Sequence, residues 1–138
     1  MEMEGLLKDL AHLNKMLFVV GGEGCVGEMY SDGETEPRFH EQWGMLESKT
    51  WHFHLNMDLV KSAQFVEAED HGAPLLYYVR FANEAGDTLL RCYFPNPYMD
   101  DSEEPAPFQP EKLRIFEEIR DRYVGQRDII FVRRPKER

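Results

Sequence analysis

Two histidines in the middle of the chain are the first candidates for chemistry. In residues 51–56 they alternate with large apolar side chains: Trp51, His52, Phe53, His54 and Leu55. If the segment is a strand, the side chains point alternately to opposite faces, so both imidazoles share one face about 7 Å apart. The apolar face then suits a core, and the imidazole face suits a ligand.

Three interpretations of this imidazole pair stay open on residue types alone. The first is that His52 and His54 are ordinary, partly exposed strand residues. The second is a non-haem metal site, because two neutral imidazoles on one side of a strand suit Zn, Mn or Fe. Asp58 weakly matches the first metal motif of cupins, but the later histidine that a cupin requires is only His71, in a predicted turn. The third is a haem pocket.

A haem pocket combines one imidazole for the iron, apolar and aromatic walls, and cations for the propionates. Two later segments supply aromatic and cationic side chains. Tyr78 and Arg80 share one face of a predicted strand over residues 75–81, and Arg91 and Tyr93 share one face of the strand that returns after a hairpin. A cross-strand Tyr/Arg cluster is therefore expected.

Composition narrows the class of partner. The 138 residues indicate one domain over residues 1–138, and 42% apolar residues suffice for a core. The net charge of −10 argues against nucleic acid and against anionic membrane surfaces. Cys25 and Cys92 are too far apart in the sequence to match the spacing of a zinc site, and we expect both to be reduced thiols. The sequence begins without a signal peptide or a membrane-spanning run, so we predict a cytoplasmic protein without membrane insertion.

The first half of the chain predicts a helix followed by short strands. Apolar residues at helical spacing favour a helix over residues 4–16. The segment from Gly22 to Gly27 matches G-x-G-x-x-G, but the chain turns again at Gly33, which leaves no room for a nucleotide-binding helix. We therefore expect a glycine-rich hairpin, with a strand over residues 25–30.

The second half contains the clearest strands and a second helix. Residues 39–46 weakly favour a strand. Strands are expected over residues 50–55, 62–67, 75–81, 88–94 and 129–132. Pro110 opens a helix that Gly125 ends. This order predicts an α+β fold in which an antiparallel sheet is flanked by an N-terminal and a C-terminal helix.

The segment 51–123 resembles the intracellular haem-utilisation proteins of the ChuX/HutX type, which are related to HemS-like haem carriers. Five segments carry the resemblance: His54-Leu55, residues 63–67, the hairpin 78–86, the strand 89–94 and the helix start 110–116. The resemblance implies a large antiparallel sheet, a homodimer, and haem binding in the cytoplasm for trafficking, storage or iron utilisation. It favours a carrier over an enzyme, and no nucleophile–base pair is readable.

The resemblance also assigns roles to the candidate residues. His54 falls where ChuX-like proteins have a histidine implicated in haem binding, so it is the expected axial ligand of haem iron. His52 aligns with a small residue there and is not a family ligand; because it lies beside His54, we expect it to be an alternate or supporting ligand. Arg80 and Arg91, with Tyr78 and Tyr93, are the expected propionate or dimer-interface groups. The chain departs from the family at Pro95-Asn96, where a Gly-Arg pair is usual. A cupin-like metal protein and an interaction domain without a pocket are the alternatives.

Overall fold

The computed structural model describes residues 2–31, 34–69 and 74–134. Its elements follow one another along the chain as α1 (Glu2–His12), β1 (Leu17–Gly22), β2 (Cys25–Tyr30), β3 (Glu36–His40), β4 (Trp43–Glu47), β5 (His52–Asn56), a 3₁₀ turn (Met57–Leu59), β6 (Ser62–Ala68), β7 (Leu76–Ala82), β8 (Thr88–Tyr93), α2 (Pro110–Tyr123) and β9 (Ile129–Arg134). This confirms the predicted α+β fold with a helix near each end.

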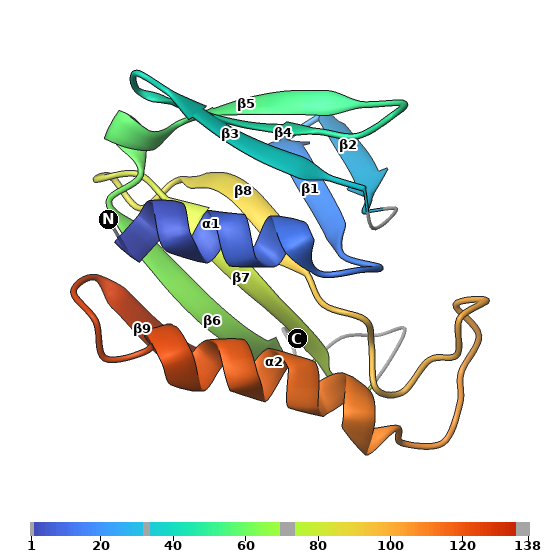
Figure 1. The fold of residues 1–138 in the computed structure, drawn as a ribbon. Helices are drawn as coiled ribbons and strands as arrows, with labels where there is room; N and C mark the ends of the chain where they lie inside the picture. Colours follow the sequence, from blue (N-terminus) through green and yellow to red (C-terminus); the bar gives the residue numbers. More distant parts are fainter. Residues whose placement is uncertain (1, 32–33, 70–73, 135–138) are drawn as a thin grey trace.

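The strands form two sheets (Figure 1). The larger has six strands in the order β2-β1-β8-β7-β6-β9, and all neighbours are antiparallel except β6 and β9, which are parallel. The smaller is the antiparallel sheet β3-β4-β5. Strands β2 and β9 are the two edges of the larger sheet.

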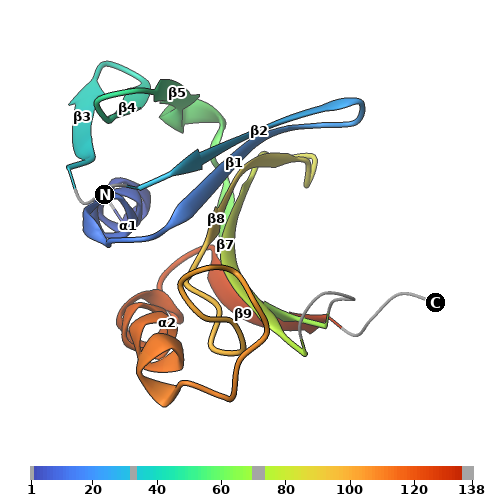
Figure 2. The ribbon, with the colours of Figure 1, turned by 90° about the vertical axis from the view of Figure 1, so that its right-hand side faces the viewer.

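One apolar core fills the space between these layers. Helices α1 and α2 and the small sheet all lie on the same side of the six-stranded sheet (Figure 2). Leu6, Leu7 and Leu10 of α1 and Phe116 of α2 are fully buried there. No described helix or strand covers the other side of the six-stranded sheet, which we call the open face.

Helix α1 ends earlier than the predicted residue 16. It stops at His12, and Lys15 adopts a left-handed backbone conformation with φ of 61°. After this turn Leu17 is no longer part of the helix, and it is the first residue of β1. The periodicity of the leucines continued through the turn, so it did not reveal the helix end.

The segment 39–46 is two strands rather than one. Glu41 has φ of 53°, and the chain reverses at Glu41-Gln42 so that β3 and β4 pair as a hairpin. The prediction of a hairpin at the glycine-rich segment is confirmed, because Gly22 pairs with Cys25 and Gly24 has φ of 86°. Glycine tolerates this left-handed conformation without steric cost.

Both cysteines are free thiols, but they lie in different environments. Cys92 is fully buried in β8, and burial raises the pKa of its thiol, whereas Cys25 is exposed at the start of β2. Among the described residues, no helix is long and apolar enough to cross a membrane.

Candidate functional site

An apolar and aromatic row crosses the open face along all six strands. Strand pairing places its members opposite one another in the order Tyr30, Leu17, Tyr93, Tyr78, Val66 and Val132. The rings of Tyr78 and Tyr93 have centroids 4.7 Å apart with planes inclined by 33°. Contacts of this kind stabilise aromatic pairs beyond the area that they bury. Val66 and Tyr78 are buried, so the continuous stretch of this row that a ligand can reach lies at Tyr30, Leu17 and Tyr93.

A second row beside it carries two guanidinium groups. Arg80 and Arg91 are directly opposite each other on β7 and β8, as the predicted Tyr/Arg cluster requires. Arg91 donates to the Tyr93 hydroxyl at 3.2 Å and lies 5.9 Å from the centre of the Tyr93 ring. Arg80 donates to Gln64, Thr88 and the Gly86 carbonyl, which are all neutral.

The cationic charge of this pair is not neutralised by a contacting carboxylate. Neither arginine makes an ion pair with any residue in the described part of the chain. Glu28 is the carboxylate of the same row, but Val19 lies between it and Arg91. The two guanidinium groups point toward opposite ends of the hairpin, since Arg80 bonds Thr88 and Gly86 whereas Arg91 bonds Tyr93. Each is therefore a separate cation that an anionic ligand could pair with.

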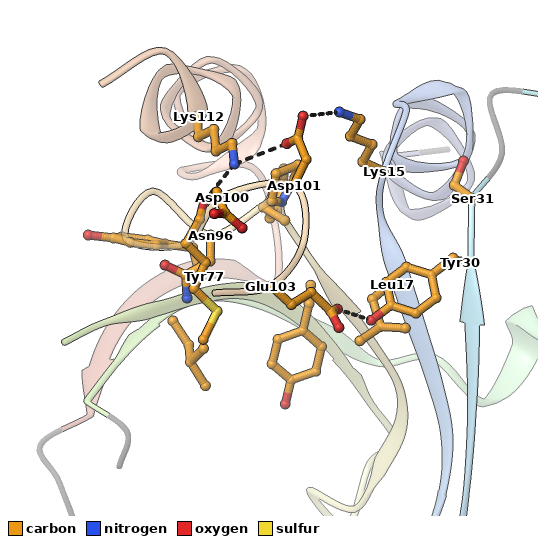
Figure 3. A pocket seen from close by; sticks show the side chains of 15 residues that line it. Lys15, Leu17, Tyr30, Ser31, Tyr77, Asn96, Asp100, Asp101, Glu103 and Lys112 are labelled. Carbon is orange, nitrogen blue, oxygen red and sulfur yellow. Dashed lines mark hydrogen bonds and ion pairs between the residues drawn. The ribbon is translucent and has the colours of Figure 1, made fainter. Parts of the chain in front are cut away.

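Two adjoining cavities lie on and beside the open face. One, of about 430 Å³, is bounded by Val19, Val26, Glu28 and Arg91. The other, of about 410 Å³, continues past the end of β8 (Figure 3). Three of the lining residues are common to both cavities: Leu17, Leu76 and Tyr93. We call the two cavities together the groove, and their size is within the range of small-molecule sites.

An acidic loop over residues 97–109, which we call the strap, forms one wall of the groove. Two contacts tie it to the β1–β2 side: the Tyr30 hydroxyl donates to Glu103, and the Lys15 ammonium lies 2.9 Å from Asp101 (Figure 3). Lys112 of α2 holds the strap from the other side through Asp101 at 3.4 Å. The strap is thus fastened by side chains from both flanking elements.

These contacts shift the pKa values of the groups that make them. The hydrogen bond to Glu103, with smaller effects of burial and of the Glu103 and Glu28 charges, raises the pKa of Tyr30 to about 12. The hydrogen bonds and charges of Lys15 and Lys112 hold the pKa of Asp101 below its ordinary value. At neutral pH the strap contacts therefore use a neutral phenol and an ionised carboxylate.

The two predicted histidines lie elsewhere, on the outward face of the small sheet. His52 and His54 are exposed on β5, while Phe53 and Leu55 point inward as the alternation predicts. The ring centroids of the two imidazoles are 5.6 Å apart. We call this outward surface of β3-β4-β5 the imidazole face.

The structure does not join the histidines to the Tyr/Arg cluster. His54 is on the outward side of β5 in the small sheet, and Arg91 and Tyr93 are on the open face of β8. The small sheet and the six-stranded sheet are separate layers (Figure 2) with the core between them. His54 lines neither cavity of the groove. The predicted site residues thus lie on two separate surfaces of one chain, and their roles stay predictions. Alternation within each strand was readable from the sequence, but the separation of the strands into two sheets was not.

The cupin-like metal site lacks a third ligand of the usual kind. Within residues 2–31, 34–69 and 74–134, no group of three His, Cys, Asp or Glu side chains is placed to hold a metal ion. Asp58 is exposed in the 3₁₀ turn after β5. His71 lies outside the described residues.

The departure at Pro95-Asn96 lies at the groove. Pro95 and Asn96 both line the cavity beside the strap. The side-chain NH₂ group of Asn96 donates to the backbone carbonyl of Leu75 at 3.0 Å, and its side-chain oxygen accepts from the backbone N–H of Tyr98 at 2.8 Å. Asn96 thus fixes the start of the strap instead of supplying a cation.

Sequence reasoning missed Lys15, Tyr30 and Glu103. Lys15 fell inside the helix predicted over residues 4–16, Tyr30 at the end of the strand predicted over residues 25–30, and Glu103 in a segment for which no contact was predicted. The available signal was the proline-bounded cluster of carboxylates over residues 100–104, which needs cations or hydroxyl donors nearby. Nothing in the sequence named the partners, because they lie more than 70 residues away.

Comparisons with known proteins agree with this architecture. A protein-family model with the generic description “-like” matches residues 4–123, which is most of the chain. No curated protein matches the chain significantly.

Solved structures share the fold at low sequence identity. Protein AGR_C_4470 from Agrobacterium tumefaciens is 22% identical with a TM-score of 0.63, over 89% of this chain and 63% of that one. The heme binding protein ChuX is 12% identical with a TM-score of 0.68, over 86% of this chain and 70% of that one. Apo-PhuS, a heme-binding protein from Pseudomonas aeruginosa, is 12% identical with a TM-score of 0.65, over 85% of this chain and 32% of that one. The chain thus spans less than two thirds of AGR_C_4470 and about one third of PhuS.

Proposed function

We propose that this chain, which belongs to the family whose model matches residues 4–123, binds haem or a related tetrapyrrole. Its fold is shared with ChuX and PhuS, whose names describe haem binding. Such binding would serve haem trafficking, storage or iron utilisation. A carrier role fits better than an enzyme, because the groove offers binding groups without a readable nucleophile–base pair.

The groove is the surface that supports this proposal best. The observation that carries it is a hollow lined by both Tyr93 and Arg91, whose guanidinium donates to the Tyr93 hydroxyl and makes no ion pair among the described residues. A macrocycle needs apolar and aromatic walls, and its propionates need cations. Leu17 and Val19 supply the apolar floor next to these groups.

Two groups are candidates for the iron. His54 is the predicted axial ligand, and its exposed imidazole can reach a haem only on the imidazole face, away from the groove. Within the groove, the Tyr93 hydroxyl is the candidate oxygen donor, since tyrosine is a known haem ligand. The hydroxyl accepts a hydrogen bond from the Arg91 guanidinium at 3.2 Å.

The first experiment is a titration of the protein with hemin, followed by the Soret band. We expect a saturable band with one equivalent of hemin. Arg91→Ala removes a charge-assisted hydrogen bond at a half-buried position, so we expect about 1–2 kcal/mol of lost binding, or an affinity about 5–30-fold lower. Arg38→Ala, which removes an exposed arginine from β3 of the other sheet, is the matched control and should bind normally. No saturable band, or equal affinity in Arg91→Ala, contradicts the groove.

A second comparison identifies the iron ligand. Tyr93→Phe keeps the ring and removes the oxygen, so the spectrum of ferric haem should change if Tyr93 is bound to iron. His54→Ala and His52→Ala should leave that spectrum unchanged. If His54→Ala instead abolishes the band while Arg91→Ala does not, haem binds on the imidazole face and the predicted His54 ligand is correct.

The remaining predictions about the protein extend this proposal. They are a single domain over residues 1–138, a cytoplasmic location and a homodimer. The alternative of an interaction domain without a ligand predicts that hemin leaves the melting temperature unchanged, whereas a ligand of the folded state must raise it. Differential scanning fluorimetry with and without hemin separates the two.

A further inference from the structure

The imidazole face carries donor atoms that the proposed haem groove does not use. Strand pairing puts Met45 of β4 directly opposite His54 of β5, on the outward side of the small sheet. Opposed residues of antiparallel strands have Cβ atoms about 4.5–5.5 Å apart, so the thioether and the imidazole can approach one metal ion. His52 adds a second imidazole, with ring centroids 5.6 Å from His54.

The cluster has an aromatic neighbour and charged neighbours of both signs. The rings of Trp43 and His54 meet edge-on, with centroids 6.3 Å apart and an angle of 60°, and an aromatic ring near a bound cation attracts it. On the same face Glu47 is directly opposite His52, and Arg38 is directly opposite Met45. His52 and His54 are exposed, and neither makes an ion pair within the described part of the chain.

We propose that Met45, His52 and His54 form a binding site for monovalent copper, with Trp43 beside the ion. A thioether is a soft ligand that selects Cu(I), while imidazole binds copper in general. Divalent zinc usually takes at least three His, Cys, Asp or Glu ligands, and no such group exists among the described residues. The donor set of one sulfur and two nitrogens therefore points to Cu(I).

The position of the donors sets the expected strength of the site. Met45 is half-buried, so its sulfur is held by the sheet, whereas both imidazoles can rotate in solvent to meet the ion. No backbone change is required, because all three side chains already share one face of paired strands. Loss of any one ligand should therefore weaken binding at least tenfold without unfolding the protein.

The test is an anaerobic competition between the protein and a coloured Cu(I) chelator. It is done in a Cys25→Ser background, because the exposed thiol of Cys25 can itself bind copper. We expect one equivalent of Cu(I) to transfer to the protein, and Met45→Leu and His54→Ala each to weaken binding at least tenfold. His40→Ala is the control, since His40 is exposed two strands away from β5 on the same sheet.

A spectroscopic readout links the ion to Trp43. Silver(I), a redox-inert stand-in for Cu(I), should quench tryptophan fluorescence, and the quenching should disappear in Trp43→Phe. Circular dichroism of each variant checks that the fold is retained. No uptake of Cu(I), or uptake that Met45→Leu does not weaken, overturns the proposal.

The copper site and the haem groove can fail separately. The copper assay contains no porphyrin, and Arg91→Ala should bind copper normally because Arg91 lies on the other sheet. Met45→Leu should likewise bind hemin normally. Zinc binding of equal strength in Met45→Leu and the parent protein, without Cu(I) binding, would assign the face to imidazole chemistry alone and overturn the thioether role.

Discussion

If the strap closes the groove, loosening it should speed both entry and exit of the ligand. The strap is tied to the β1–β2 side by the Tyr30–Glu103 hydrogen bond and the Lys15–Asp101 ion pair. The double variant Tyr30→Phe/Lys15→Ala removes both contacts and leaves the lining residues Leu17 and Tyr93 in place. The strap is closed in the free protein and would also be closed over a bound ligand. The two contacts therefore stabilise the closed form by the same free energy with and without ligand.

The magnitude follows from the exposure of the two contacts. The Tyr30 side chain is about half exposed, and the Lys15 and Asp101 side chains are 56% and 66% exposed. The Tyr30–Glu103 hydrogen bond contributes about 0.5–1 kcal/mol, and the solvent-exposed Lys15–Asp101 ion pair adds little after screening by solvent. Removing both shifts the opening equilibrium by about 0.5–1 kcal/mol, so the open population should rise about 2–5-fold.

The assay is stopped-flow mixing with hemin, which gives association and dissociation rates. Both rates should rise about 2–5-fold in the double variant, while the Kd stays within about twofold. Lys49→Ala is the control, because it breaks an ion pair of the same length, with Glu34, that involves no groove residue. Unchanged rates would show that the strap is a fixed wall, and a weaker Kd with unchanged association would show that these side chains touch the ligand.

Three further results are expected. The folded-state pKa of Asp101 lies below its ordinary 3.8, so its ion pair with Lys15 stabilises the protein above that pH. This contribution is lost as the pH falls through the folded-state pKa. It is measured by comparing the melting temperatures of Asp101→Asn and the parent protein between pH 6 and pH 3. Phe116→Ala should lower the free energy of unfolding by about 3–5 kcal/mol in urea titrations, because the 1% exposed ring contacts four other aromatic rings. Cys25 should react with Ellman's reagent at once, whereas Cys92 should react only on unfolding, because its thiol is buried and its pKa is raised.

Local patterns in the sequence predicted most strands and their faces. The alternation around His54 correctly gave an inward apolar side and an outward imidazole side, and the pairing of Tyr78 with Tyr93 followed from one hairpin. These features depend on neighbours a few residues apart or on a short connection. They can be read because side-chain direction in a strand repeats every two residues.

Long-range relations were not readable in the same way. Whether β5 joins the sheet of β8 depends on how the chain between them is placed, and no residue type encodes that choice. The turns at Lys15 and Glu41 were also hidden, since neither is the glycine or asparagine typical of a left-handed conformation. The Lys15–Asp101 contact joins residues 86 positions apart, beyond any local pattern.

The opposed pair Arg80 and Arg91 has a consequence for how an anionic ligand arrives. The whole chain carries a charge of −10, so a ligand with two carboxylates is repelled at a distance and attracted only close to the guanidinium groups. Salt at physiological strength shortens the range of the repulsion to about 8 Å. Hemin association should then accelerate as salt is added, the reverse of the behaviour of a protein that draws its anionic partner in from afar.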